Sequence, residues 1–346
     1  MTERDNKIVV TGLAAISSAG VGTDPIREAL RDGMSRLQPV PEEVLGGGHF
    51  WGQVRGFKVS DYMPPLKARK FDRCSQFAVV AAGMALKDAG MELGRMDRAR
   101  IGILLGCGFG GITNSEEFLR GYFTKGVDGL IPMLFPNTVS NAPASNASIE
   151  YGLKGPNVTL VQRFCSAESA LLMACRFLEE DRADVMLTGG VDELNSTMMR
   201  GFSAVGQLRS YARGFTEGAG LLVLEKGAYA RQRGASIRGS LGDIRSIGRL
   251  VKGAEEEGLS RLLGTTQDLS LLSLSGVAAG METVLKRFPS TPRLETGRIL
   301  GYSLAMGGLS MAALLLSLLS GQRAVHLAAS PEGPYYAVEF NGGPSV

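Results

Sequence analysis

The side chain best placed to act as a nucleophile, Cys165, lies where a short predicted strand meets a predicted helix. Residues 158–161 form a β-prone run, and residues 166–178 carry apolar side chains at helical spacing. A second apolar strand is predicted at 184–189. A strand that ends at a helix N-terminus suits acyl transfer, because the helix dipole stabilises an anion and free backbone N–H groups can bind an oxyanion. The sequence therefore predicts that this strand–helix junction is the candidate site.

A glycine-rich turn offers a different chemistry. Gly106, Gly108 and Gly111 satisfy the pattern G-x-G-x-x-G, between a predicted strand at 101–105 and a predicted helix. Dinucleotide binding also needs an acidic residue about 20 positions further on, at the end of a second parallel strand. The segment 120–132 shows no strand alternation. We therefore expect neither a dinucleotide nor any other cofactor.

Histidine, the usual general base, is scarce. The chain has only His49 and His326. His49 lies in an irregular glycine-rich stretch, and His326 lies in the apolar run AVHLAA, which is typical of a core strand. Neither position predicts a catalytic role.

The order of several motifs resembles the β-ketoacyl-acyl-carrier-protein synthases, over nearly the whole chain. The motifs are KIVVTGLAAISSAG at 7–20, RKFDRCSQFAVVAA at 69–82, GCGFGG at 106–111, FPNTVSNAPASNASIEYGLKGPN at 135–157, GFTEGAGLLVLE at 214–225 and FNGG at 340–343. The resemblance implies a duplicated five-layer α/β fold of the thiolase type (α-β-α-β-α). It also implies two thiolase-like halves, at 1–234 and 235–346.

The catalytic residues of that family are missing from the matching positions. Active members carry T-A-C-S-S at the start of the helix, and alignment on the flanking motifs places Phe164 where their cysteine stands. Ser275 takes the place of the first family histidine, and Tyr302 takes the place of the second. Decarboxylative condensation needs a thiolate and donors that stabilise an enolate and an oxyanion. We therefore expect no catalytic residue in this chain, which would not be an enzyme on its own.

The resemblance then implies a chain length factor, the silent subunit that pairs with an active ketosynthase in type II polyketide or fatty-acid-like systems. The expected partners are that ketosynthase, an acyl carrier protein and the acyl or polyketide chain in a shared tunnel. The strand that begins at Val158 would pair across the two-fold axis, and Phe164 would fill the vacated acyl pocket. By position, the tunnel and interface residues are Ile112, Ser115, Leu119, Leu134 and Phe164. Ordinary interface packing explains these residues equally well, although the small Ser115 would leave a tunnel more open.

Three other functions stay open. Cys165 would be a displaced nucleophile in an active synthase, but one residue along a helix turns a side chain by about 100°. A malonyl-carrier-protein decarboxylase would need a hydrogen bond to the thioester, which Phe164 cannot make. A scaffold unrelated to acyl chemistry would not co-purify with a ketosynthase.

Composition limits the remaining classes. The chain has 346 residues and a net charge of +3, which gives no case for nucleic acid binding. The four cysteines show no metal-ligand spacing and are typical of free thiols in a cytoplasmic protein. The charged start of the chain predicts no signal peptide. Basic residues at 67–73 fit an acidic carrier protein, although an ordinary solvated helix start is the commoner explanation.

The uncharged stretch 301–322 imitates a membrane span, but its glycines and serines favour a buried core helix at about 309–319. No membrane association is therefore expected. A long helix is predicted at 72–90, and further core strands are predicted around 268–276 and 297–304. Residues 33–66, including Trp51, are rich in glycine and proline and are predicted to form an irregular surface excursion.

Overall fold

Long apolar strands form the centre of the molecule. The computed structural model describes residues 7–209, 214–251, 253–266, 268–276, 285–330 and 333–343. Every residue of β1 (Ile8–Ser17), β5 (Ile101–Cys107) and β7 (Val185–Asp192) is buried. Strands that are covered on both faces read as continuous apolar runs. The strands expected at 101–105 and 184–189 are confirmed, and each runs further than expected.

One strand arrangement occurs twice. The other main strands are β6 (Asn157–Leu160), β9 (Gly218–Lys226), β10 (Gly239–Ile247), β11 (Leu271–Gly276), β12 (Arg293–Leu294), β13 (Arg323–Ala329) and β14 (Tyr335–Gly342). The order is β6-β5-β7-β9-β1 in the first half and β12-β11-β13-β14-β10 in the second. In each half the first three strands are parallel and the next two pairings are antiparallel. The pairing therefore reveals an internal duplication that residue identities do not.

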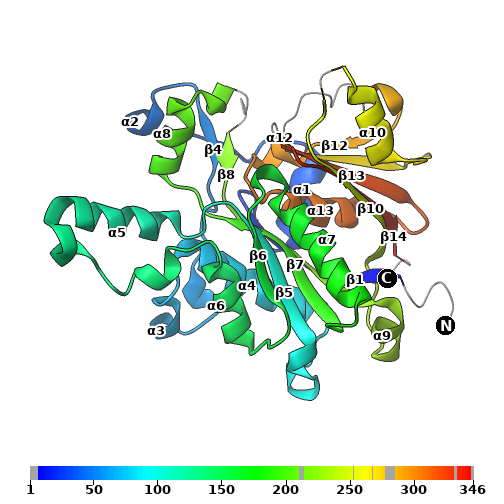
Figure 1. Ribbon diagram of the computed structural model, residues 1–346, viewed down its shortest axis with the longest axis horizontal. Coiled ribbons are helices and arrows are strands. Elements are labelled where there is room, and N and C mark those ends of the chain that lie inside the picture. The colour runs from blue at the N-terminus through cyan, green and yellow to red at the C-terminus, as the bar shows by residue number, and fades with distance from the viewer. Residues whose placement is uncertain are drawn as a thin grey trace.

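Helices complete five layers (Figure 1). α4 (Arg73–Asp88) and α6 (Ala142–Tyr151) pack on the outer face of the first half. α7 (Ser166–Glu179) and α13 (Gly307–Ser317) contact each other between the halves. α10 (Glu255–Leu263) covers the outer face of the second half. This order confirms the duplicated α-β-α-β-α fold and the buried core helix near the C-terminus.

The pleat of the strands decides which layer each side chain meets. Ile103 and Leu105 of β5 belong to the outer cluster with α4, whereas Leu104 belongs to the inner cluster with α7. β1 and β10 connect the halves through a short antiparallel pairing of Val9 with Ser240. We propose that the boundary between the two thiolase-like halves lies at 234/235, just before β10.

The remaining elements are short or peripheral. They are α1 (Thr23–Asp32), α2 (Glu42–Leu45), α3 (Pro65–Ala68), α5 (Ile112–Lys125), α8 (Ser196–Ala204), α9 (Gly227–Gln232), α12 (Thr296–Leu300), β2 (Gly20–Val21), β3 (Gln38–Pro39), β4 (Phe50–Gly52) and β8 (Phe215–Thr216). Among the described helices, none combines the length and the apolar character that crossing a bilayer requires.

Two expectations are wrong. The core strand expected at 297–304 is instead the helix α12 followed by a turn at Gly301, which has a φ of 93°. The strand in that part of the second half is the two-residue β12. The excursion at 33–66 is not confined to the surface, because β4 pairs with β8 and Trp51 is buried.

Candidate functional site

The strand–helix junction forms a sharp elbow at the position predicted for a nucleophile. β6 ends at Leu160, residues Arg163–Cys165 form one 3₁₀ turn, and α7 begins at Ser166. Arg163 has a φ of 49°, a left-handed conformation that a non-glycine residue rarely adopts. Such outliers cluster at functional sites. The elbow therefore carries Phe164 at the position expected for the nucleophile, directly after the left-handed Arg163.

Phe164 is enclosed by other apolar side chains. It is 3% exposed, and its ring centroid lies 6.4 Å from that of Phe215. Phe215 stacks on Phe202 at 4.4 Å, and Phe109 lies 6.1 Å from Phe202. The rest of this cluster includes Val40, Trp51, Leu194, Met198, Met199 and Leu208. A column of aromatic rings therefore runs from the elbow to the surface at Phe109, which is 44% exposed.

Cys165 is unsuited to nucleophilic attack. Its side chain is completely buried beside Ala328 and Tyr336, and its thiol donates a hydrogen bond to the carbonyl oxygen of Pro334 at 3.2 Å. Burial, followed by the negative charge of Glu168, raises the pKa of the Cys165 thiol well above its usual value. Because the thiolate is the reactive form, this thiol is inert at neutral pH.

The positions expected to have lost histidines also converge on the start of α7. Tyr302 forms a bridge with Phe215, the residue that contacts Phe164. Ser275, at the end of β11, pairs with Ala328, which packs against Cys165. The Ser275 hydroxyl is buried and finds no hydrogen-bond partner within the described part of the chain. The three positions at which the family's catalytic residues are expected are therefore connected through shared neighbours, and they present a phenyl ring, a hydroxyl and a phenol.

A buried group of three hydrogen-bonded polar side chains lies one helical turn from the elbow. His326 Nε2 is 2.8 Å from Glu168 Oε1, and His326 Nδ1 is 3.0 Å from Ser273 Oγ. All three side chains are completely buried. Gly307 makes this possible, because a Cβ there would lie 1.9 Å from Glu168 Oε1. The sequence placed His326 correctly in a core strand but missed Glu168, whose charge on the buried face of α7 was the available indication.

The glycine-rich turn allows α7 to pack closely and donates a hydrogen bond to a carboxylate. A Cβ on Gly106 would lie 2.3 Å from the backbone of Ser166, so this glycine lets α7 approach β5. The Gly108 N–H donates to Asp192 Oδ1 at 2.7 Å, and the Ala305 N–H donates to Asp192 Oδ2 at 2.8 Å. Burial raises the pKa of Asp192 to about 6, against the opposing effect of these bonds. The turn thus joins the two halves through Asp192.

The expected tunnel residues lie on or next to α5. Ile112 is half-buried against the Phe164 cluster, whereas Leu119 is 50% exposed. The Ser115 hydroxyl donates to the carbonyl oxygens of Gly111 and Thr138. Leu134 is half-buried on the loop that returns from α5. Their role in a tunnel stays a prediction.

Two of the basic residues expected to offer a carrier surface already have acidic partners. Lys67 pairs with Glu150 at 2.6 Å, and Arg73 pairs with the buried Glu217 at 2.5 Å. The Arg73 guanidinium also lies over the ring of Phe77. Arg73 is therefore part of the packed structure rather than a free surface charge.

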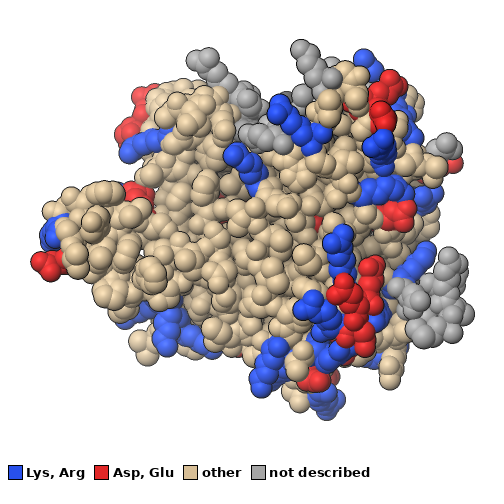
Figure 2. All heavy atoms as spheres, viewed as in Figure 1, with Lys and Arg blue, Asp and Glu red and all other residues tan. Residues whose placement is uncertain are grey.

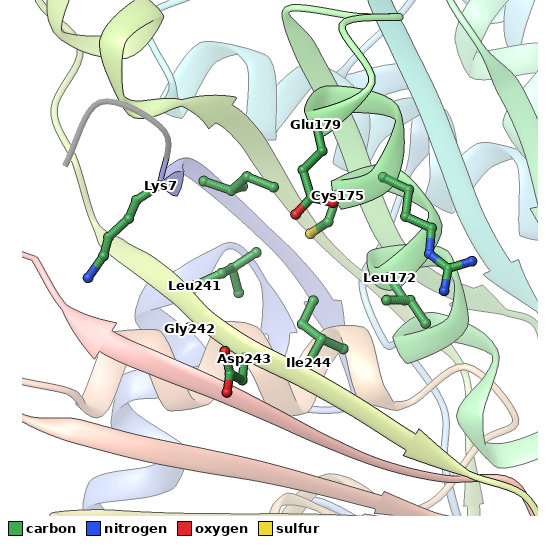
Figure 3. A pocket seen from close by; sticks show the side chains of 10 residues that line it. Lys7, Leu172, Cys175, Glu179, Leu241, Gly242, Asp243 and Ile244 are labelled. Carbon is green, nitrogen blue, oxygen red and sulfur yellow. The ribbon is translucent and has the colours of Figure 1, made fainter. Parts of the chain in front are cut away.

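A cavity of about 310 Å³ lies away from the elbow, between the C-terminal half of α7 and β10 (Figure 3). Its charged lining is mixed and comprises Lys7, Arg176, Glu179 and Asp243. Burial raises the pKa of its Cys175 thiol, which disfavours the reactive thiolate there. Within the described ranges, no group of three or more His, Cys, Asp or Glu side chains is placed to hold a metal ion.

Solved structures share the fold. A type II polyketide synthase acyl-carrier protein in complex with its ketosynthase, and the ishigamide ketosynthase/chain length factor, each match with a TM-score of 0.82 and 20% identity. Each match covers 97% of this chain and 99% of the other. At this identity the likeness shows the thiolase-like ketosynthase fold alone.

Sequence comparison identifies the family. The 3-oxoacyl-(acyl-carrier-protein) synthase 2 of Vibrio cholerae is 31% identical over 250 residues, which span 67% of this chain and 60% of that protein. The synthase of the same name from Vibrio harveyi is 28% identical over 322 residues, 87% of this chain and 77% of that protein. The family described as "Beta-ketoacyl synthase, N-terminal domain" matches residues 5–230. The match spans more than half of the 346 residues of this chain. The chain therefore belongs to the β-ketoacyl synthase family.

Proposed function

We propose that this chain is a non-catalytic chain length factor of the cytoplasm. It pairs with an active ketosynthase and shapes the tunnel in which acyl carrier protein presents a growing acyl or polyketide chain. The observation that carries this proposal is Phe164, an aromatic hydrocarbon side chain buried on an intact nucleophile elbow. A phenyl ring neither attacks a thioester nor accepts a proton.

The neighbouring side chains support loss of catalysis rather than its relocation. Cys165 is buried with a raised pKa, and Ser275 and Tyr302 stand where the histidines are expected. His326 is committed to Glu168 inside the core. An active synthase using Cys165 is the alternative that the experiment must exclude, because the curated relatives are named as synthases.

The character of the surface supports the proposal that this chain binds a partner subunit. Figure 2 shows a broad face with few charges over α5, β6 and α6. Exposed apolar side chains of α5, of the loop that follows it and of α6 include Phe123 at 79%, Met133 at 82% and Ile149 at 78%. Apolar patches of this kind mark interaction sites.

The free edge of the sheet lies on the same face. Among the described strands β6 pairs with β5 alone, so its outer edge is available to a strand of the partner. Val161, at the end of β6, is 55% exposed. The solved ketosynthase/chain length factor pair is consistent with such an assembly.

Co-expression with a candidate ketosynthase, with the purification tag on this chain alone, tests the proposal. We expect a one-to-one complex that condenses malonyl-carrier protein. Its activity should survive Cys165→Ala in this chain and disappear when the partner's nucleophilic cysteine is replaced. Condensation by this chain alone that disappears with Cys165→Ala would show an active enzyme with a displaced nucleophile.

A further inference from the structure

The helix that carries most of the expected tunnel residues projects from the body of the protein (Figure 1). We define the arm as residues 112–136, which comprise α5, the 3₁₀ turn Gly126–Gly129 and the returning loop. None of the residues of α5, all of which are described, is buried. Core packing therefore does not fix the orientation of the arm, and the contacts at its base must do so.

One buried carboxylate holds the start of the arm. Glu193 directly follows β7 and is 3% exposed. Its Oε1 accepts the backbone N–H of Thr113 at 2.5 Å, and its Oε2 accepts the backbone N–H of Cys74 at 3.1 Å. These N–H groups lie in the first turns of α5 and α4, where the helix dipole favours a negative charge. Glu193 thus bridges the projecting helix to a helix that is buried along most of its length.

The other end of the arm returns to the same place. The Asn137 amide donates to the carbonyl oxygen of Lys70 at 2.8 Å and accepts from Asn146 at 3.0 Å. A Cβ on Gly111 would lie 2.2 Å from the carbonyl oxygen of Asn137, so the two ends of the arm touch. The Asn137 bonds are neutral. The charged contacts of α5 at the base of the arm are Glu193 and Glu116, whose Oε2 accepts from the Asn195 side-chain amide at 3.1 Å, and of these two Glu193 ties the start of α5 directly to α4.

We propose that Glu193 is a positioning residue that fixes the arm and, through Ile112 and Leu119, the wall of the acyl tunnel. The first part, that Glu193 fixes the arm, rests on the contacts of Glu193. The second part, that the arm sets the wall of the acyl tunnel, rests on the proposed function. Glu193 touches no reacting atom in this role.

The surroundings of Glu193 make its hold on the arm sensitive to pH. The titratable and charged groups that interact with it are Asp72, Arg73 and Cys74 at the start of α4. Two further groups surround these: Glu217, which pairs with Arg73, and Cys107 of β5, which interacts with Cys74. Burial and the charge of Asp72 raise the pKa of Glu193 to about 7, while the N–H donors act in the opposite direction. As the pH falls through about 7, Glu193 gains a proton and loses the charge that strengthens both bonds.

Hydrogen exchange at the first turn of α5 tests the first part. In the wild-type chain, protection of the Thr113–Glu117 amides, corrected for intrinsic exchange rates, should fall between pH 8.5 and pH 6. Glu193→Gln should lower protection by roughly 10- to 100-fold at pH 8.5 and abolish the pH dependence. Glu117→Gln is the matched control, since it removes the same charge from an exposed position on the same turn. Protection that is independent of pH in the wild type, or equal in both variants, would overturn the proposal.

Product analysis of the complex with its partner tests the second part. Glu193→Gln should change the distribution of product lengths while the rate of condensation stays within about twofold, and Glu117→Gln should change neither. Altered exchange with unaltered products would overturn the link to the tunnel. Failure to form a complex would count against the proposed function alone, because exchange is measured on the full chain with or without its partner.

Discussion

Replacing Phe164 tests whether its side chain contributes to stability by packing or takes part in catalysis. The ring is 3% exposed and packs against Phe215 within a buried apolar cluster. Truncation of a buried phenylalanine to alanine costs about 3 to 5 kcal/mol, because transfer free energy is lost and a cavity remains. We therefore expect Phe164→Ala to lower the free energy of unfolding by that amount. Phe164→Leu keeps most of the apolar volume and should cost about 1.5 kcal/mol.

Urea unfolding followed by tryptophan fluorescence measures this change, because the chain's single tryptophan, Trp51, belongs to the same cluster. Condensation by the complex with the partner ketosynthase, assayed at a temperature where both variants stay folded, should remain within about twofold of wild type. A loss of less than about 1 kcal/mol for Phe164→Ala would show that the elbow is not packed as described. A tenfold loss of condensation in a folded variant would refute the conclusion that Phe164 only packs the core.

Further outcomes follow from other buried groups. Native protein should resist alkylation at Cys165, which reacts only after unfolding, as peptide mass spectrometry would detect. Gly307→Ala should destabilise the chain by about 3 kcal/mol or more, measured by urea unfolding, since the new Cβ meets the buried Glu168 carboxylate; an unchanged midpoint would contradict the packing of α13. Burial raises the pKa of Asp192 to about 6, so its contribution to stability is fully present below the unfolded pKa near 4 and is lost as the pH rises through about 6. At about 1.4 kcal/mol per pKa unit, wild type should lose roughly 2 kcal/mol relative to Asp192→Asn between pH 4.5 and pH 7, and parallel urea titrations at these two pH values would check this.

Sequence periodicity predicted the parts of the fold in which local pattern and burial agree. α7 and the strands on either side of it were placed correctly, because an apolar helix face and continuous apolar strands leave few alternatives. The segment 297–304 was misassigned because alternating apolar residues and glycines imitate a strand, whereas tertiary packing selects the helix α12. Trp51 was placed on the surface because short strands such as β4 carry too few residues for a pattern.

The sequence could predict only those site residues whose positions are marked by neighbouring motifs. The flanking motifs predicted Phe164 at the strand–helix junction, where it is buried, and its role in filling the acyl pocket stays a prediction. The pairing of Glu168 with His326 spans 158 residues of sequence, and the bridge from Glu193 to Thr113 spans 80, so no local pattern reports either contact. Such contacts depend on the order of the strands.

The contact between Glu168 and His326 bears on how the chain unfolds. Glu168 belongs to the first of the two strand repeats, whereas His326 and Ser273 belong to the second. Separating the repeats would break this buried pair and expose the apolar faces with which α7 and α13 pack together, so neither repeat buries its own interior alone. The two repeats are therefore expected to melt as one cooperative unit despite their duplicated topology. Chain fragments divided before β10 should gain native structure only when they are mixed.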